Sequence, residues 1–214
     1  EETAQTVDLR QVFEQGRMTM KVIVGLSFVV MFLTFLYAFT MRPGVLFPKT
    51  FLREAEDAAE EGDVEALRAI CADNDSAAAR IIESATELMA GDTRADYMVI
   101  RDAIEDEGAR QAGVLWQRIQ YLQDMAVVAP MLGLLGTVLG MMRSFAGLQG
   151  DLNFEDKASA LAAGVGQAMY TTAGGLVVGI VTMAIYAFFR GHVNSLIGGL
   201  ESACNRVLRR FASK

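Results

Sequence analysis

Three long runs without a charged side chain constrain this 214-residue chain more than any other feature of its sequence. They extend from Val22 to Met41, from Met125 to Met142 and from Ala158 to Phe189. At about 1.5 Å of rise per residue, helices of these lengths suit a hydrocarbon core of roughly 30 Å. The alternative for each run is a buried core helix, but a soluble chain would need a large polar shell to cover three of them. We therefore predict an all-α membrane protein with three transmembrane helices and long helices that extend into a cytoplasmic helical domain.

The rest of the composition excludes several classes of protein. The net charge is -7, so the chain lacks the excess of Lys and Arg that binds nucleic acid phosphates. Two cysteines, Cys71 and Cys204, cannot build a disulfide scaffold. His192 is the single histidine, which leaves no Ser/His/Asp or Cys/His arrangement and no histidine-ligated metal site. We expect neither an enzyme nor a nucleic-acid-binding protein, and no metal or cofactor.

The positions of Lys and Arg near the ends of the runs predict the orientation in the membrane. The tail after Phe189 holds five basic residues against one acidic residue, which assigns it to the cytoplasm. The acidic connection 149–157 is assigned to the outside, and three crossings then put the N-terminus outside, although Arg10, Arg17 and Lys21 weaken the rule there. The predicted segments are an outer N-terminal segment 1–21, transmembrane helix 22–41, cytoplasmic helical domain 42–124, transmembrane helix 125–148, outer loop 149–160, transmembrane helix 161–189 and cytoplasmic C-terminal helix 190–214.

The start of the chain leaves two alternatives open. The run from Val22 to Met41 is too long for the apolar part of a signal peptide, and no small-residue cleavage site follows it. Glu1 in place of Met fits either a boundary within a longer protein or the removal of a signal peptide upstream.

Capping signals divide the segment between the first two runs into several helices. A stretch rich in Ala and Glu begins at Thr50 and stops at Gly62, and Asp63 can cap the helix that follows. Ser76 starts another helix, which Gly91 ends. Acidic residues such as those between positions 54 and 61 are interpreted as a solvated helix face, with a docking surface as the alternative.

The last helix of this segment is predicted to continue without a break into the second apolar run. Thr93 with Asp96 resembles a capping pair at its start, and Gly108 and Gly113 interrupt it without a proline or polar turn. Pro130 should only bend it. Its apolar positions at helical spacing are Val99, Ile100, Ala103, Ile104, Ala112, Leu115, Ile119 and Leu122. The C-terminal tail should pack on the acidic domain through Val193, Leu196, Ile197, Leu200, Val207 and Leu208.

Small residues form a stripe along each of the last two spanning helices. The stripe of the second helix consists of Gly133, Thr137, Gly140 and Ser144, with Gly136 and Gly140 at the four-residue spacing typical of close helix packing. The stripe of the third helix consists of Gly164, Ala168, Thr172, Gly175, Gly179 and Thr182. Because lipid gives helices no hydrophobic reason to associate, such stripes indicate that the two helices face each other or a partner.

No Asp, Glu, Lys or His lies inside any of the three runs. A chain that carried protons alone would be expected to hold an ionisable group at membrane depth, so a partner would have to supply it. The polar side chains of the last two runs are mainly Thr137, Gln167, Thr171, Thr172 and Thr182. Two interpretations of Thr137 and Thr172 stay open: each hydroxyl bonds back to its own helix in a packing seam, or it points into a wet path.

Two segments in these runs resemble a known family. They are Ala129-Pro130-Met131-Leu132-Gly133-Leu134-Leu135-Gly136-Thr137-Val138-Leu139-Gly140-Met141-Met142 and Gly164-Val165-Gly166-Gln167-Ala168-Met169-Tyr170-Thr171-Thr172-Ala173-Gly174-Gly175-Leu176. Both are similar to the ExbB/TolQ branch of the MotA/TolQ/ExbB proton-channel proteins. The layout of one helix, a helical domain, two closely spaced spanning helices and a tail is similar over nearly the whole chain. A stator subunit of the MotA type fits less well, because those proteins have a fourth spanning helix.

The resemblance implies a homo-oligomeric ring, a pentamer in the ExbB-like branch, in the bacterial inner membrane with a periplasmic N-terminus. The ring would surround two copies of an ExbD/TolR-like partner, a single-span protein with a membrane aspartate, and would act on periplasmic or outer-membrane machinery. Protons would be the transported ion, and Thr137 and Thr172 would line their path. Gly133, Gly136, Gly140, Ser144, Gly164, Ala168, Thr171, Gly175 and Gly179 would line the pore or pack the helices.

Gln167 departs from the family pattern, since many ExbB and TolQ proteins have a glutamate at this position. The ring therefore lacks a titratable group at this site, whereas titration of the partner's aspartate is unaffected. Gln167 is instead expected to form hydrogen bonds within the ring.

These observations predict a non-enzymatic subunit of a proton-driven motor. The alternative is a non-conducting oligomeric scaffold that anchors a partner through small-residue helix contacts. Lipid is expected around the spans in either case. No residue distinguishes nutrient uptake, envelope maintenance or motility as the process that is powered.

Overall fold

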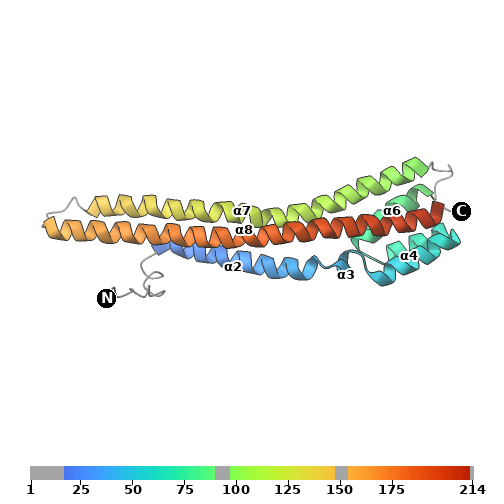
Figure 1. The fold of residues 1–214 in the computed structure, drawn as a ribbon, viewed down its shortest axis with the longest axis horizontal. Coiled ribbons are helices and arrows are strands. Elements are labelled where there is room, and N and C mark those ends of the chain that lie inside the picture. Colours follow the sequence, from blue (N-terminus) through green and yellow to red (C-terminus); the bar gives the residue numbers. More distant parts are fainter. Residues whose placement is uncertain (1–16, 90–96, 148–153, 213–214) are drawn as a thin grey trace. The chain divides into compact units, whose positions relative to one another are not determined.

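The computed structural model describes residues 17–89, 97–147 and 154–212, and the regular elements in these ranges are all helices. They are α2 (Arg17–Thr40), α3 (Pro43–Leu46), α4 (Lys49–Glu61), α5 (Val64–Ala72), α6 (Ala77–Met89), α7 (Tyr97–Gly147) and α8 (Phe154–Ala212) (Figure 1). Three of them, α2, α7 and α8, contain stretches long and apolar enough to cross a membrane. The predicted fold class, all-α with three spanning helices that extend into further helical structure, is confirmed.

The chain divides into two compact units, which are described separately. The spanning unit comprises residues up to Phe35 and from Gln120 to Ala187, and the helical unit comprises Leu36–Ile119 and Phe188–Lys214. In the spanning unit, α7 and α8 lie side by side (Figure 1). The side chain of Met20 on α2 lies against α8 at Gly174. All three predicted spans therefore contribute to one compact bundle.

Pro130 lies inside α7, and the helix continues through it as the sequence predicts. Gly108 and Gly113 also lie within α7, and neither has a neighbouring element close to the position of an added Cβ atom. These two glycines do not end the helix, because nothing after them supplies a stop signal. The expected Thr93–Asp96 capping pair and the stop at Gly91 lie outside the described residues.

The capping residues of the helical unit end and start its helices as predicted. Gly62 follows α4 with a φ of 75°, in the left-handed region that glycine adopts without a steric penalty. The Asp63 carboxylate accepts a hydrogen bond from the amide of Ala66 at 3.0 Å, at the start of α5. The Ser76 hydroxyl accepts one from the amide of Ala79 at 3.2 Å, at the start of α6. Each cap satisfies an amide that has no partner within its helix.

The core of the helical unit joins the C-terminal part of α8 to α4, α5, α6 and α7. Its buried members are Phe51, Leu52, Ala55, Ala58, Ala59, Leu67, Cys71, Ala78, Ala79, Ile81, Ile82, Ala85, Ile100, Ile104, Leu200, Ala203, Cys204 and Val207. The predicted packing of the tail on the acidic domain is confirmed by its residues in this core. The side chain of Leu208 lies outside the described residues.

Val99 corrects one detail of the predicted apolar face of α7. Its side chain is 49% exposed, whereas Ile100 and Ile104 are buried in the core. Adjacent residues on a helix point about 100° apart, and at this position Ile100 points into the core while Val99 lies outside it. The spacing was compatible with either residue, and the packing selects Ile100.

Candidate functional site

Small residues of α7 and α8 meet along the centre of the spanning unit. We define the glycine seam as Gly133, Gly136, Gly140 and Ser144 of α7 with Gly164, Ala168, Thr171, Thr172, Gly175 and Gly179 of α8. Contacts pair Gly133 with Gly175 at one level and Ser144 with Gly164 at another, so the two helices run antiparallel. The structure thereby brings together both stripes of small residues from the sequence.

The helix backbones approach each other closely enough in the seam that glycine is required. A Cβ atom added to Gly175 would lie 2.6 Å from the carbonyl oxygen of Ala129 and 3.0 Å from the Cα atom of Gly133. One added to Gly179 would lie 2.7 Å from the ring of Pro130 and 3.0 Å from the carbonyl oxygen of Ala126. In a membrane, such close approach supplies the van der Waals contacts that hold helices together.

A hydroxyl group links the two helices directly. The Thr172 hydroxyl on α8 donates a hydrogen bond to the carbonyl oxygen of Gly133 on α7, over 3.1 Å. This bond fits neither of the two alternatives from the sequence, because its acceptor is on the other helix. A glycine at position 133 lets α8 come close enough for this bond, because a Cβ atom there would crowd the backbone of Thr172. Only the register of the two helices reveals that Thr172 lies opposite this carbonyl. The Thr172 oxygen keeps lone pairs that can accept a further hydrogen bond.

The other threonines of the seam region bond to their own helices. The Thr137 hydroxyl donates to the carbonyl oxygen of Leu134 at 2.6 Å, and its side chain is partly exposed beside the seam. The buried Thr171 donates to the carbonyl oxygen of Ala168 at 2.7 Å and lies against Gly136. For Thr137, the back-bonded alternative is therefore the observed geometry. Its oxygen, like that of Thr172, can still accept a hydrogen bond from a further donor.

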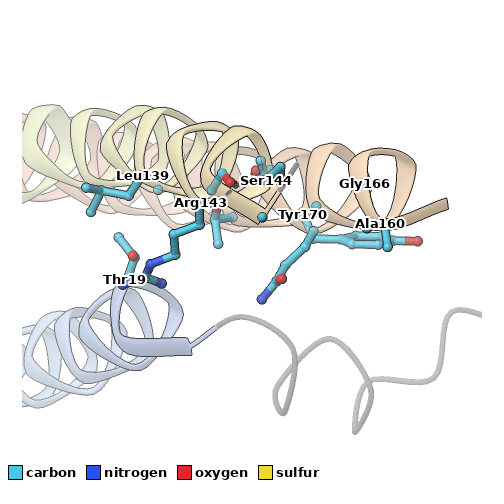
Figure 2. Close-up of a pocket in the computed structure, with 15 residues that line it drawn as sticks. Thr19, Leu139, Arg143, Ser144, Ala160, Gly166 and Tyr170 are labelled. Atoms are coloured by element: carbon cyan, nitrogen blue, oxygen red, sulfur yellow. Dashed lines mark hydrogen bonds between the residues drawn. The ribbon is translucent and has the colours of Figure 1, made fainter. Parts of the chain in front are cut away.

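A pocket of about 580 Å³ opens beside one end of the seam. Arg143 and Ser144 of α7 line it together with Gln167 and Tyr170 of α8 and Thr19 of α2. Figure 2 shows the Arg143 side chain extending from α7 toward Thr19. Gln167 is half-buried in this lining, and its expected hydrogen bond within the ring stays a prediction.

Arg143 and Thr19 were not among the predicted site residues. Arg143 follows the end of the second uncharged run, a position typical of an arginine that only reaches the membrane interface. Thr19 lies on α2, whose side-chain pattern has no stripe that would indicate which face meets α7 and α8. The described residues contain no group of three or more His, Cys, Asp or Glu side chains that could hold a metal ion.

The fold and the seam define a multi-pass helical membrane protein whose closest-packed spans carry hydroxyl groups but no carboxylate. The sequence pattern of the MotA/TolQ/ExbB proton channel family matches residues 73–202, more than half of the chain, and the chain belongs to this family. The matched range includes α7 and most of α8, and thus the whole glycine seam.

Several relatives support the ExbB branch. The chain is 41% identical over 86 residues to the putative biopolymer transport protein ExbB-like 3 of Synechocystis, covering 39% of this chain and 41% of the relative. It is 33% identical over 88 residues to the biopolymer transport protein ExbB of Salmonella typhimurium, covering 41% of this chain and 35% of the relative. A putative ExbB homologue of Methanothermobacter thermautotrophicus is 32% identical over 102 residues, covering 48% and 35%. The chain thus spans less than half the length of these relatives.

Proposed function

We propose that this chain is the ring-forming subunit of an inner-membrane proton-driven motor. The ring surrounds an ExbD/TolR-like partner with one spanning helix and a membrane aspartate, and couples proton flow to work in the cell envelope. Its N-terminus is periplasmic and its C-terminus cytoplasmic. The proton is the transported ion, and no cofactor takes part. Membership of the proton channel family and similarity to ExbB proteins support this proposal.

The observation that carries the proposal furthest is the Thr172 hydroxyl bound to the Gly133 carbonyl within an uncharged seam. A carboxylate brought to this depth by a partner would need hydrogen-bond donors and water but no fixed cation, because a fixed cation would hold it permanently ionised. Hydroxyls that can exchange their hydrogen-bond partner meet this need. A proton gains about 2.3 kcal/mol per 100 mV of membrane potential, which suffices to bias such an exchange.

Gln167 limits which side chain can titrate. Its amide stays neutral at all relevant pH values, and the three uncharged runs contain no Asp, Glu, Lys or His. The proposed cycle therefore uses the partner's aspartate alone. The spans of this chain provide polar contacts along the path, and their own side chains neither accept nor release a proton.

Thr172→Val in the complex with its partner is expected to reduce proton uptake into proteoliposomes by about tenfold or more, the effect of losing one hydrogen bond to a charged group. Uptake is measured with an internal pH-sensitive dye under an imposed potential. Thr172→Ser keeps the hydroxyl and should retain most of the uptake. Thr34→Val is the matched control, because the Thr34 hydroxyl bonds only to Val30 of its own helix at 2.7 Å.

The scaffold alternative predicts a different result from the same experiment. If the complex takes up no protons under any condition while it still assembles, the chain anchors its partner without conducting. The back-bonded hydroxyl of Thr137 is compatible with that alternative, because a hydroxyl already bonded within its own helix needs no further role. Equal uptake by Thr172→Val and the unchanged complex would contradict a path through this seam.

The mass of the complex purified with its partner is expected to correspond to a pentamer around two partner copies. Native mass spectrometry gives both copy numbers from one sample. The pocket beside the seam, lined by the polar side chains of Arg143, Ser144 and Gln167, offers a surface that a second copy of the chain could contact. A stable monomer bound to one partner would contradict the ring.

A further inference from the structure

A second pocket, of about 240 Å³, lies in the helical unit where α2 ends and α6 begins. Thr40, the last residue of α2, lines it together with Ser76 and Ala77 at the start of α6. The opposite wall comes from α7. Neither the glycine seam nor the proposed proton path includes any of these residues, so the pocket has no role in the function proposed above.

Three guanidinium groups line this pocket, those of Arg80, Arg110 and Arg118, against one carboxylate, that of Asp75. Arg110 is held by Glu107 through two bonds of 2.6 and 2.7 Å, which neutralise much of its charge. Within the described parts of the chain, Arg80 and Arg118 form no direct ion pair, although the charge of Arg80 attracts that of Glu107. The acidic side chains near Arg80 are Glu83, Glu87 and Glu107, which line an adjacent pocket with it. Among the basic residues of α7 that precede the uncharged run at Met125, Arg118 is the nearest to that run.

The position along the chain places this pocket at the boundary between membrane and water. Thr40 ends the apolar span of α2, and Arg118 lies about two helical turns before the uncharged run that begins at Met125. The polar layer of a bilayer extends about 5–7 Å beyond the hydrocarbon core, and a long arginine side chain reaches into it. Leu36, one turn before Thr40, is 45% exposed, and Phe39, the residue immediately before Thr40, is 61% exposed. Apolar surface therefore adjoins the cationic pocket on its membrane side.

We propose that this pocket binds the phosphate-bearing headgroup of an anionic phospholipid, with the acyl chains lying along Leu36 and Phe39. Guanidinium groups pair with phosphate oxygens through two parallel hydrogen bonds, a geometry that ammonium groups do not provide. The Thr40 hydroxyl already donates to the carbonyl oxygen of Leu36 at 2.7 Å, so the arginines supply the donors. The volume suits a headgroup, and the chains remain outside. Bound lipid would fix the level of α2 relative to the bilayer surface.

The test compares lipid retention by the full chain in complex with its partner, purified from nanodiscs that contain phosphatidylglycerol and phosphatidylcholine. Native mass spectrometry counts the retained lipids and identifies them by mass. Replacing the two arginines that form no direct ion pair, Arg80→Gln with Arg118→Gln, is expected to weaken retention of phosphatidylglycerol about 25-fold, since each basic group at a membrane surface contributes about fivefold. Phosphatidylcholine retention should not change.

The matched control replaces two exposed arginines of the same unit that lie outside the pocket, Arg53→Gln with Arg68→Gln. This control should retain phosphatidylglycerol as the unchanged complex does. If the double variant fails to assemble, Arg118→Gln alone is tested, and it is expected to weaken retention of phosphatidylglycerol about fivefold. Unchanged retention by the pocket variant, or an equal loss in the control, would overturn the proposal. Displacement of the lipid by millimolar inorganic phosphate would also overturn it, because the pocket would then be a site for soluble phosphate.

Discussion

Gly175→Ala is expected to destabilise the packing of α7 against α8 by roughly 1–3 kcal/mol, the usual penalty for overpacking a close-packed site. The added Cβ atom would lie 2.6 Å from the Ala129 carbonyl oxygen and 3.0 Å from the Cα atom of Gly133. These atoms belong to the helix backbone and cannot move aside by changing a rotamer. The two helices must separate, which lengthens the Thr172–Gly133 hydrogen bond as well.

Gly166→Ala is the matched control for this substitution. Gly166 also lies in α8, but no atom comes within 4 Å of a Cβ added there, so only helix propensity changes. Equilibrium unfolding in mixed SDS micelles should show a lower midpoint for Gly175→Ala and an unchanged or higher midpoint for Gly166→Ala. If both variants unfold at the same midpoint, the close approach at Gly175 does not contribute to stability.

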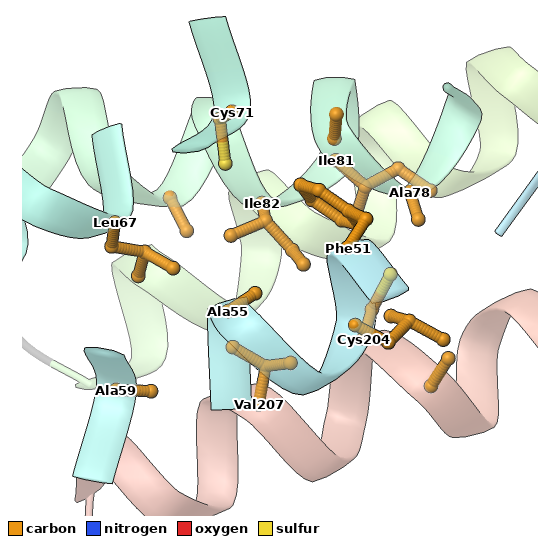
Figure 3. Packing of buried hydrophobic residues seen from close by; sticks show 14 of the residues in the cluster. Phe51, Ala55, Ala59, Leu67, Cys71, Ala78, Ile81, Ile82, Cys204 and Val207 are labelled. Carbon is orange, nitrogen blue, oxygen red and sulfur yellow. The ribbon is translucent and has the colours of Figure 1, made fainter. Parts of the chain in front are cut away.

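Phe51→Ala is expected to lower the free energy of unfolding of the helical unit by about 3–5 kcal/mol, the range for truncating a buried phenylalanine. Phe51 is 2% exposed, and Figure 3 shows its ring among Ile81 and Ile82 of α6 and Cys204 of α8. It therefore joins the tail of α8 to the helices that precede α7 in the sequence. Removing the ring leaves a cavity at the point where these segments meet.

The rate at which the two native cysteines react with maleimide measures how far Phe51→Ala opens this core. Cys71 is buried, and burial, with a smaller contribution from the nearby charge of Glu83, raises the pKa of its thiol to about 12. Maleimide at pH 8 should therefore label the intact protein very slowly, because the thiolate is the reactive form. Phe51→Ala should speed labelling of Cys71 and Cys204 severalfold. Met98→Ala, which truncates a side chain that is 55% exposed on α7, should leave the labelling rate unchanged.

The sequence predicted features that depend on local chemistry. The absence of charge defines the three spans, and Gly62, Asp63 and Ser76 mark helix ends because their effects act within one helical turn. The resemblance to ExbB/TolQ proteins also depends on contiguous segments, and the family match confirms it. The roles of Thr137, Thr172 and Gln167 in proton transfer stay predictions.

Features that depend on the register between helices could not be predicted. Two stripes of small residues indicate that helices meet, but not that Thr172 lies opposite Gly133, because sliding one helix by a turn gives an equally plausible match. The two pockets depend on α2, whose apolar residues surround it on every side and indicate no preferred face. Periodicity likewise could not choose between Val99 and Ile100.

Pro130 gives α7 a point of low bending stiffness opposite Gly179. A proline has no amide hydrogen, so position 130 cannot donate the usual helical hydrogen bond to the carbonyl oxygen of Ala126. This carbonyl oxygen lies on the side of α7 that faces Gly179. Tilting α7 at this level breaks no hydrogen bond between Ala126 and position 130, because proline forms none there. The tilt can only open α7 away from α8, because Pro130 and the Ala126 carbonyl already lie against the bare Cα atom of Gly179. A change in the angle of α7 is therefore expected at Pro130, at the edge of the seam that begins at Gly133.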